Sequence, residues 1–139
     1  QLPDNLLESF NADDHNLLIF DDCLDSLIHD KKFKSIIVSI YIRGRHKSVS
    51  VMFLTQKLST IPTTIRENST HLIIFGKATT DIKNTLSRIV YDYRIWSEIY
   101  KMIEKAGDFL FIDLSGKRPG ESRINLNFKE WLDVSDIYE

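Results

Sequence analysis

The stretch that most constrains the fold is LLIFDD, in which four large apolar residues, Leu17 to Phe20, run directly into Asp21 and Asp22. A continuous apolar run of this length is typical of a strand covered on both faces, as in a parallel sheet. Burying an unpaired carboxylate costs so much free energy that the group would sooner change its protonation state. We therefore expect a buried strand over 16–20 that delivers two carboxylates to solvent, to a partner or to a metal ion.

Further apolar runs alternate with helical patterns along the chain. Together they predict an α/β layered fold with a mainly parallel sheet. The other predicted strands lie at 48–56, 71–76, 109–114 and 123–128. The last two flank a glycine-rich turn and predict a terminal β-hairpin. Apolar spacings of three and four residues predict helices over 24–45, over 62–68, from about 80 onward and over 96–105. With no repeat and no boundary signal, residues 1–139 are predicted to form a single domain.

Composition limits the classes of function. The formal net charge of −2 gives no general attraction to nucleic acid, so any phosphate contact must come from a local cluster such as Arg43–Lys47 or the 116–120 turn. Cys23 is the one cysteine, which fits a reducing intracellular setting and excludes an internal disulfide. No apolar run approaches the length of a membrane span. The chain begins at Gln1 rather than Met, so we expect an upstream portion.

The polar residues that follow two predicted strands are the candidate catalytic residues. Ligands gather beyond the carboxyl ends of parallel strands, where Asp21 is a candidate magnesium ligand and Asp22 a candidate base for an attacking water. Gln56, after the 48–56 strand, offers a donor and an acceptor to a γ-phosphate or a water. This pattern is typical of the Walker B strand of a P-loop ATPase. The alternative is that both acids cap the next helix and that Gln56 only starts a turn.

Order and spacing extend this interpretation to a known family. LLIFDD is followed by RGRHKSVSVMFLTQ and then by IPTTIRENSTHLIIF. This order resembles the second half of the genome-packaging ATPases of large DNA viruses, of poxvirus and virophage type, within the FtsK/HerA superfamily. The resemblance covers about residues 16–76. It depends on the acid pair, Arg45 and His46, Leu54 to Gln56, Pro62, Arg66 and Asn68 taken together.

The resemblance implies a RecA-like P-loop sheet flanked by helices that uses ATP and magnesium. Asp21 would match the magnesium ligand, Asp22 the catalytic acid where many relatives have Glu, and Gln56 a polar sensor that contacts the nucleotide. Arg43, Arg45 and Arg66 are the candidates for an arginine finger inserted into a neighbouring subunit. The implied partners are double-stranded DNA, a capsid component and further copies in a homo-oligomeric ring. The implied location is the viral factory, the host cytoplasm or the virion.

The Walker A half of such an ATPase is absent from this chain. That loop requires G-x-x-x-x-G-K-[ST], because its backbone N–H groups and lysine cradle the phosphates. Neither Gly76-Lys77 nor Gly116-Lys117 has the required glycine and hydroxyl residues around it. We expect residues 1–139 to be the C-terminal portion of the ATPase core, from the Walker B strand onward, and to be inactive alone. A degenerate relative that does not hydrolyse ATP is the alternative.

Two other classes of protein stay open at the level of sequence. One is a metal-dependent nuclease or phosphohydrolase that uses Asp21, Asp22 and Asp25. The other is a non-catalytic α/β interaction module. Four aromatic residues also suggest a base-stacking platform, although their helical spacing favours packing: Tyr91, Tyr93, Trp96 and Tyr100.

Overall fold

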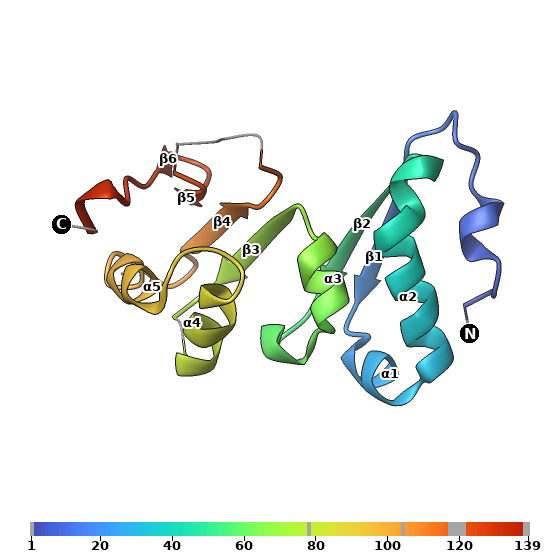
Figure 1. The fold of residues 1–139 in the computed structure, drawn as a ribbon, viewed down its shortest axis with the longest axis horizontal. Helices are drawn as coiled ribbons and strands as arrows, with labels where there is room; N and C mark the ends of the chain where they lie inside the picture. The colour runs from blue at the N-terminus through green and yellow to red at the C-terminus, as the bar shows by residue number, and fades with distance from the viewer. Residues whose placement is uncertain (1, 78, 104, 117–121, 138–139) are drawn as a thin grey trace. The chain divides into compact units, whose positions relative to one another are not determined.

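The computed structural model describes residues 2–77, 79–103, 105–116 and 122–137, and these fall into two compact units. Unit 1 comprises residues 1–68 and unit 2 comprises residues 69–139, from blue to green and from green to red in Figure 1. Two compact units can belong to one domain, so the predicted single domain stays a prediction.

Unit 1 is built on a parallel pair of strands, β1 (Asn16–Asp21) and β2 (Val49–Leu54). A parallel pair requires a crossover connection, and here helices supply it (Figure 1). The helical segments of the unit are η1 (Leu6–Ser9), α1 (Leu24–His29), α2 (Lys31–Arg43), η2 (Gly44–Lys47), η3 (Leu58–Thr60) and α3 (Thr63–Asn68). The predicted strand at 16–20 and the predicted helix at 62–68 are therefore confirmed.

The two faces of the β1–β2 pair differ in burial. On one face Phe20 packs in a core with Ile37 and Ile40 of α2, both of which are fully buried. On the other face Leu17 and Ile19 are each 57% exposed. Met52 and Leu54 of β2 continue this exposed face. The prediction of strands covered on both faces is wrong for the described part of the chain, because α2 covers one face only.

The predicted helix over 24–45 is two helices. Asp30 interrupts it with an extended backbone, φ −101° and ψ 102°. Its Oδ1 accepts hydrogen bonds from the backbone N–H groups of Lys32, at 2.9 Å, and Phe33, at 3.0 Å. Asp30 is thus the N-cap of α2 and satisfies two N–H groups that a helix start leaves without partners.

Unit 2 contains an antiparallel sheet with the strand order β3-β4-β5-β6. Its strands are β3 (His71–Phe75), β4 (Phe109–Asp113), β5 (Ile124–Leu126) and β6 (Glu130–Trp131). The β4–β5 hairpin is confirmed. The mainly parallel sheet is not, because β3 pairs antiparallel with β4 and lies in a different sheet from β1 and β2. The fold is therefore mixed α/β, with a parallel two-stranded sheet and an antiparallel four-stranded sheet.

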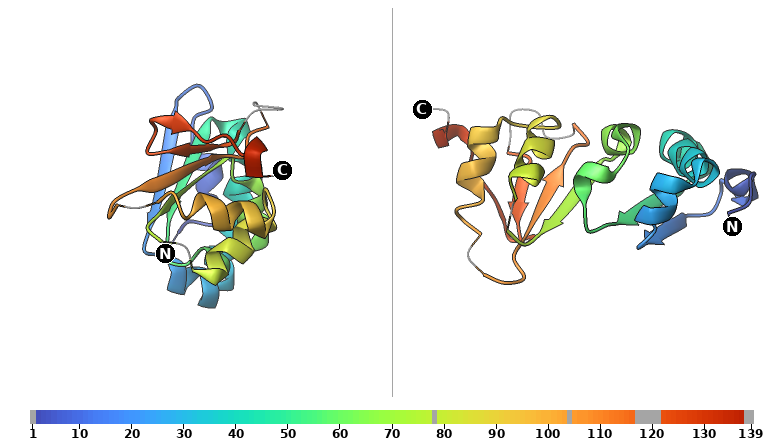
Figure 2. Two further views of the ribbon diagram at one scale, coloured as in Figure 1. Left: turned by 90° about the vertical axis from the view of Figure 1, so that its left-hand side faces the viewer. Right: turned by 90° about the horizontal axis from the view of Figure 1, so that it is seen from below.

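Helices α4 (Thr80–Ser87) and α5 (Tyr93–Ile99) lie over one face of this sheet (Figure 2). The short η4 (Ser135–Ile137) follows the last strand. Trp96 is fully buried, and its indole Nε1 donates to the carbonyl of Val90 at 2.8 Å. The packing role favoured for Trp96 by its helical spacing is thereby confirmed. The helix predicted over 96–105 begins three residues earlier and ends at Ile99. Within the described ranges, no helix has both the length and the apolar composition that crossing a bilayer requires.

We expect Asp30→Ala to lower the free energy of unfolding by about 1 kcal/mol, because it removes the N-cap of α2. Urea denaturation followed by circular dichroism measures the loss. Asp13→Ala, at an exposed position before β1, is the matched control and should change stability little. Equal effects of the two substitutions would contradict the capping role.

We expect the protein to lose stability at high pH because two of its tyrosines are largely buried. Burial raises the pKa of Tyr41 and of Tyr100 to about 12. The folded state therefore holds these phenol protons more tightly than the unfolded chain, whose tyrosines titrate near pH 10. The contribution of the two protonated phenols to the free energy of unfolding is fully present below about pH 10 and is lost as pH rises towards 12. Urea denaturation across this range should show a smaller decline for Tyr41→Phe/Tyr100→Phe than for Tyr93→Phe, which changes a partly exposed ring.

Candidate active site

The register of the parallel pair brings the candidate residues to one edge of unit 1. Asp21 lies opposite Leu54, the last residue of β2. The chain continues to Asp22 after β1, and to Thr55 and Gln56 after β2. Both strands point the same way, so the acid pair and the glutamine leave the sheet at the same end. Asp21, Asp22 and Gln56 are all exposed there. We call this end the carboxylate edge.

Asp22 ends β1 with an unusual backbone conformation. Its φ is 51°, in the left-handed region that L-residues other than Asn, Asp and Gly adopt at a cost. The residue turns the chain out of the strand direction before α1 begins. Aspartate adopts this left-handed conformation more readily than most residues, and uncommon backbone conformations of this kind often accompany functional sites.

Neither carboxylate of the pair caps the following helix. The N-cap of α1 is Cys23, with no side-chain capping hydrogen bond, while the Cys23 Sγ lies 3.1 Å from the carbonyl of Asp21. Within the described part of the chain, the carboxylates of Asp21 and Asp22 have no hydrogen-bond or ion-pair partner. The capping interpretation is therefore wrong. Both charges are kept in solvent, where they are free to bind a ligand.

A turn presents Gln56 at the end of β2. The backbone N–H of Lys57 donates to the hydroxyl of Thr55 at 3.2 Å, which closes a short turn around Gln56. The alternative interpretation, in which Thr55 and Gln56 start a turn, agrees with this hydrogen bond. The hydroxyl residue two positions before Lys57 was the available signal for this turn.

The candidate arginines lie elsewhere. Arg45 is exposed in η2, immediately before β2. Gln56 follows the other end of that six-residue strand, which spans about 20 Å. Arg45 therefore lies a full strand length from the carboxylate edge of its own unit. Arg66 of α3 is half-buried, and its guanidinium donates to the carbonyl of Ile61 at 3.1 Å and to the hydroxyl of Thr63 at 3.2 Å. Arg66 thus has a local structural role.

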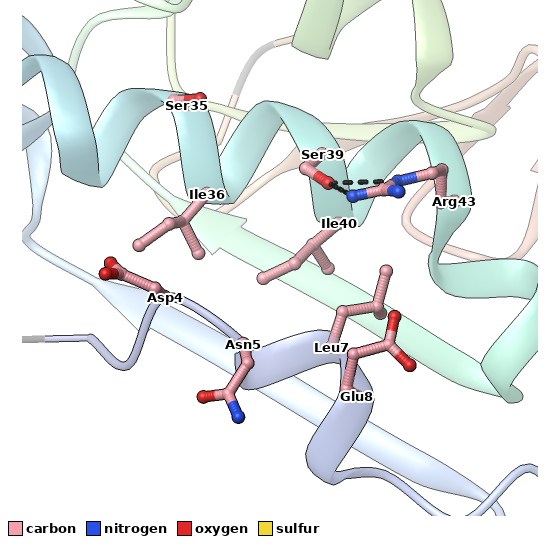
Figure 3. Close-up of a pocket in the computed structure, with 9 residues that line it drawn as sticks. All are labelled: Asp4, Asn5, Leu7, Glu8, Ser35, Ile36, Ser39, Ile40 and Arg43. Carbon is pink, nitrogen blue, oxygen red and sulfur yellow. Dashed lines mark hydrogen bonds between the residues drawn. The ribbon is translucent and has the colours of Figure 1, made fainter.

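Arg43 lines a pocket of about 200 Å³ between η1 and α2. Figure 3 shows its guanidinium folded along its own helix towards Ser39, whose Oγ it contacts from Nε at 3.1 Å and from Nη2 at 2.5 Å. Asp4 and Glu8 line the same pocket and would repel a phosphate. None of the residues of the carboxylate edge contributes to it.

The donors at the carboxylate edge suit a Mg²⁺ ion whose remaining ligands are water and phosphate better than a metal ion held by protein ligands alone. Mg²⁺ in phosphate-binding sites is held by one or two carboxylates, with waters and phosphate oxygens completing the octahedron. Asp21 and Asp22 are suitable carboxylates, and both are exposed and have no ion pair with another residue of the described ranges. No set of three His, Cys, Asp or Glu residues in the described ranges is arranged to hold a metal ion. The edge therefore suits an ion that arrives with phosphates.

The basic clusters are only partly described. In Arg43–Lys47, Lys47 pairs with Glu8 at 3.2 Å, whereas Arg45 has no ion pair with any described residue. In the 116–120 turn, positions 117–120 lie outside the described residues. The exposed positive charge of Arg45 therefore lies at the end of β2 opposite to the carboxylate edge, whereas the exposed Lys57 follows Gln56 at the carboxylate edge itself.

The fold and the site define a mixed α/β protein whose parallel strands present two carboxylates and an amide at one edge. The chain matches the family model described as Poxvirus A32 protein over residues 5–104. The match spans more than half of the 139 residues, so the chain belongs to the poxvirus A32 family, the family of the poxvirus genome-packaging ATPase. The resemblance is thus confirmed at the level of the family. Neither the search of curated proteins nor that of solved structures gave a match.

We expect Asp22→Ala to lower the free energy of unfolding by about 1 kcal/mol, because alanine tolerates the left-handed backbone poorly. Asp22→Asn should leave stability nearly unchanged, since asparagine tolerates this conformation. Thermal or urea denaturation measures the difference. A loss of stability on Asp22→Asn equal to that on Asp22→Ala would mean that the carboxylate itself stabilises the fold.

Proposed function

We propose that residues 1–139 form the Walker B side of a RecA-like P-loop ATPase of the FtsK/HerA type. Its ATP hydrolysis drives viral double-stranded DNA into a capsid. The observation that carries the proposal is the parallel register of β1 and β2, which places the acid pair and Gln56 at one exposed edge. Membership of the poxvirus A32 family supports the same function.

Each residue at the carboxylate edge has a role in this proposal. Asp21 holds Mg²⁺, which when bound neutralises charge on the β- and γ-phosphate oxygens. Asp22 accepts a proton from the attacking water and orients it. The Gln56 amide hydrogen-bonds the water or the γ-phosphate, using its donor and acceptor together. These roles explain why two exposed carboxylates have no partner among the described residues.

The phosphate cradle must come from outside these 139 residues, because their sequence contains no G-x-x-x-x-G-K-[ST]. The pairing of β2 supports this part of the proposal. Among the described strands, β2 pairs only with β1, so its other edge is open. A parallel strand added there would carry a glycine-rich loop at its carboxyl end to the same rim as Asp22 and Gln56. That strand belongs to an upstream segment or to another chain.

Arg45 acts in trans in this proposal. Its distance of a strand length from the carboxylate edge of its own unit excludes a role there, whereas a neighbouring copy in a ring can bring it to the phosphates. Arg45 is preferred to Arg66, whose guanidinium is bonded locally, and to Arg43, which bonds Ser39. A homo-oligomeric ring in the viral factory or host cytoplasm, docked on a capsid component, completes the proposed motor.

A metal-dependent nuclease is less well supported. Such enzymes use several acidic or histidine ligands around one or two ions. The described residues provide no set of three, and Asp25 lies beside His29 on α1, with 3.5 Å between Oδ1 and Nε2. The proposed ATPase needs only the two carboxylates that the edge supplies. A non-catalytic interaction module would leave those carboxylates without a task.

We expect a protein that joins this chain to its glycine-rich loop to hydrolyse ATP in the presence of Mg²⁺. Asp22→Asn should lower kcat by about 10²-fold or more, because it removes the base while preserving the fold. Asp25→Asn, three residues away on α1, is the matched control and should keep activity. Wild-type ATPase activity of Asp22→Asn would contradict the proposal, and nuclease activity without ATP would favour the rival.

Mixing subunits tests the position of the arginine. Asp22→Asn and Arg45→Ala proteins should each be inactive alone. Mixed together they should recover part of the activity, because some interfaces then combine an intact Asp22 with an intact Arg45. A mixture of Asp22→Asn with Arg66→Ala in place of Arg45→Ala should show no such recovery if Arg66 has only a structural role. Full activity of Arg45→Ala alone would exclude Arg45 as the finger.

A further inference from the structure

The sheet of unit 2 carries an exposed aromatic face on the side away from α4 and α5. The register places Phe75 opposite Phe109, and Phe111 in line with Asn125 and Trp131, so these side chains lie on one face. The ring of Phe128 packs against those of Phe109 and Phe111 and joins this face. The intervening residues of β4 and β5, such as Leu110 and Ile124, are fully buried on the other face. We call the set Phe75, Phe109, Phe111, Phe128 and Trp131 the aromatic face.

The rings of the aromatic face form a continuous series. Phe128 has its ring centroid 4.9 Å from that of Phe109 and 5.1 Å from that of Phe111. The series extends to Phe75, 5.2 Å from Phe109, and to Trp131, 6.2 Å from Phe111. Phe75, at one end of the series, and Phe128, at its centre, are the most accessible rings, at 67% and 61% exposed. Burial therefore does not account for Phe75 and Phe128, whereas Phe109 and Phe111 are half-buried.

The backbone holds Phe128 in this series at a cost. Asn127 and Phe128 both have φ 57° in the turn between β5 and β6. Asn127 tolerates this conformation and is fixed by its side chain, which accepts from Phe109 N–H and donates to Asp108 Oδ1, both at 2.8 Å. A bulky residue such as Phe pays for a left-handed backbone with free energy and is rare there. A strained and exposed phenylalanine indicates a function rather than a contribution to folding.

Three lysines lie at one end of the aromatic face. Lys77 follows the end of β3, Lys105 precedes β4 and Lys129 follows Phe128, so the topology places all three at the end where Phe75 and Phe109 pair. All three are exposed, and none has an ion pair with a described residue. Glu130, opposite Leu126, lies on the other face of the sheet.

Asp108, the acid at this end of the sheet, is engaged by other groups. Its Oδ2 accepts from the backbone N–H of Lys105 at 2.9 Å, and its Oδ1 accepts from Asn127. These donors are neutral and leave Asp108 its charge, but three lysines outnumber this one aspartate among the described residues at this end, so positive charge predominates beside the exposed rings although the net charge of the chain is −2.

From this combination we infer that the aromatic face of unit 2 binds single-stranded DNA. Exposed rings offer stacking surfaces to unpaired bases, and neighbouring lysines contact the phosphates of the same strand. A duplex hides the faces of its bases within its own stack, so the rings select unpaired DNA. The three lysines would add no binding free energy with a purely apolar protein partner. Charge complementarity therefore favours a polyanion. The inference does not depend on the proposed ATPase.

The test uses the 139-residue chain and a fluorescein-labelled oligothymidylate of about 16 nucleotides, with binding measured by fluorescence anisotropy at low salt. We expect Phe75→Leu and Phe128→Leu each to weaken binding about tenfold, since leucine keeps the apolar surface but loses the stacking ring. Leucine at position 128 bears a backbone cost comparable to that of Phe. Tyr93→Leu, on α5 and away from the aromatic face, is the matched control and should bind as the wild type does.

Salt dependence separates the lysines from the rings. Lys77→Gln and Lys129→Gln should each reduce the slope of log K against log salt by about 0.7, whereas Lys31→Gln on α2 should leave it unchanged. Binding of a matched duplex as tight as that of the single strand would overturn the inference, as would wild-type binding by both Phe→Leu variants. Absence of DNA binding by the wild-type chain would also overturn the inference. So would self-association of the wild-type chain that the Phe→Leu variants abolish, because the aromatic face would then be a protein contact. None of these results depends on ATP hydrolysis.

Discussion

The backbone hydrogen bonds between β1 and β2 determine where every candidate catalytic side chain lies. Asp21 is opposite Leu54, so both strands end together. The residues that follow them, Asp22 after β1 and Gln56 after β2, therefore share one edge. An antiparallel pairing would have sent Asp22 and Gln56 to opposite ends of the sheet, about 20 Å apart. A slip of one residue would have turned Phe20 out of the core. The core contacts of Phe20 with α2 therefore stabilise the same register that forms the carboxylate edge.

An uncommon backbone conformation occurs at both proposed sites. Asp22 has a left-handed backbone at the carboxylate edge, and Phe128 has one on the aromatic face. The exposed carboxylates of Asp21 and Asp22 contribute no hydrogen bond to the described fold, just as the exposed rings contribute little burial. Folding alone explains neither set. In the two proposals, Mg²⁺ bound with a nucleotide neutralises the carboxylates, and unpaired bases stack on the rings.

Much of unit 1 could be predicted from sequence because its signals are local. The apolar run before Asp21 predicts β1, and Pro62 predicts the start of α3. The break at Asp30 was missed because helical spacing continues on both sides of it, although an aspartate before Lys31 is a normal N-cap. Exposure of Leu17 and Ile19 could not be predicted, since an apolar run does not reveal how many faces are covered.

Unit 2 shows where local signals fail. The run HLIIF predicts β3 but not its direction, which depends on pairing with a strand more than thirty residues later in the chain. The aromatic face was missed for the same reason, because its rings come from β3, from β4 and from the β5–β6 turn and meet only in the folded sheet. The aromatic residues that the sequence did suggest are close together in the chain. One of them, Trp96, is buried in the core.

The most direct test of the central claim is paramagnetic broadening of backbone amide signals in the NMR spectrum of the protein that joins this chain to its glycine-rich loop, with ATP bound and Mn²⁺ in place of Mg²⁺. If the carboxylate edge is a metal site formed by the ends of β1 and β2, the signals of Asp21, Asp22 and Gln56 should broaden first and together. Those of Arg45 and His46, at the other end of β2, should persist. Broadening centred on other acids, or on Asp21 and Asp22 without Gln56, would contradict the account.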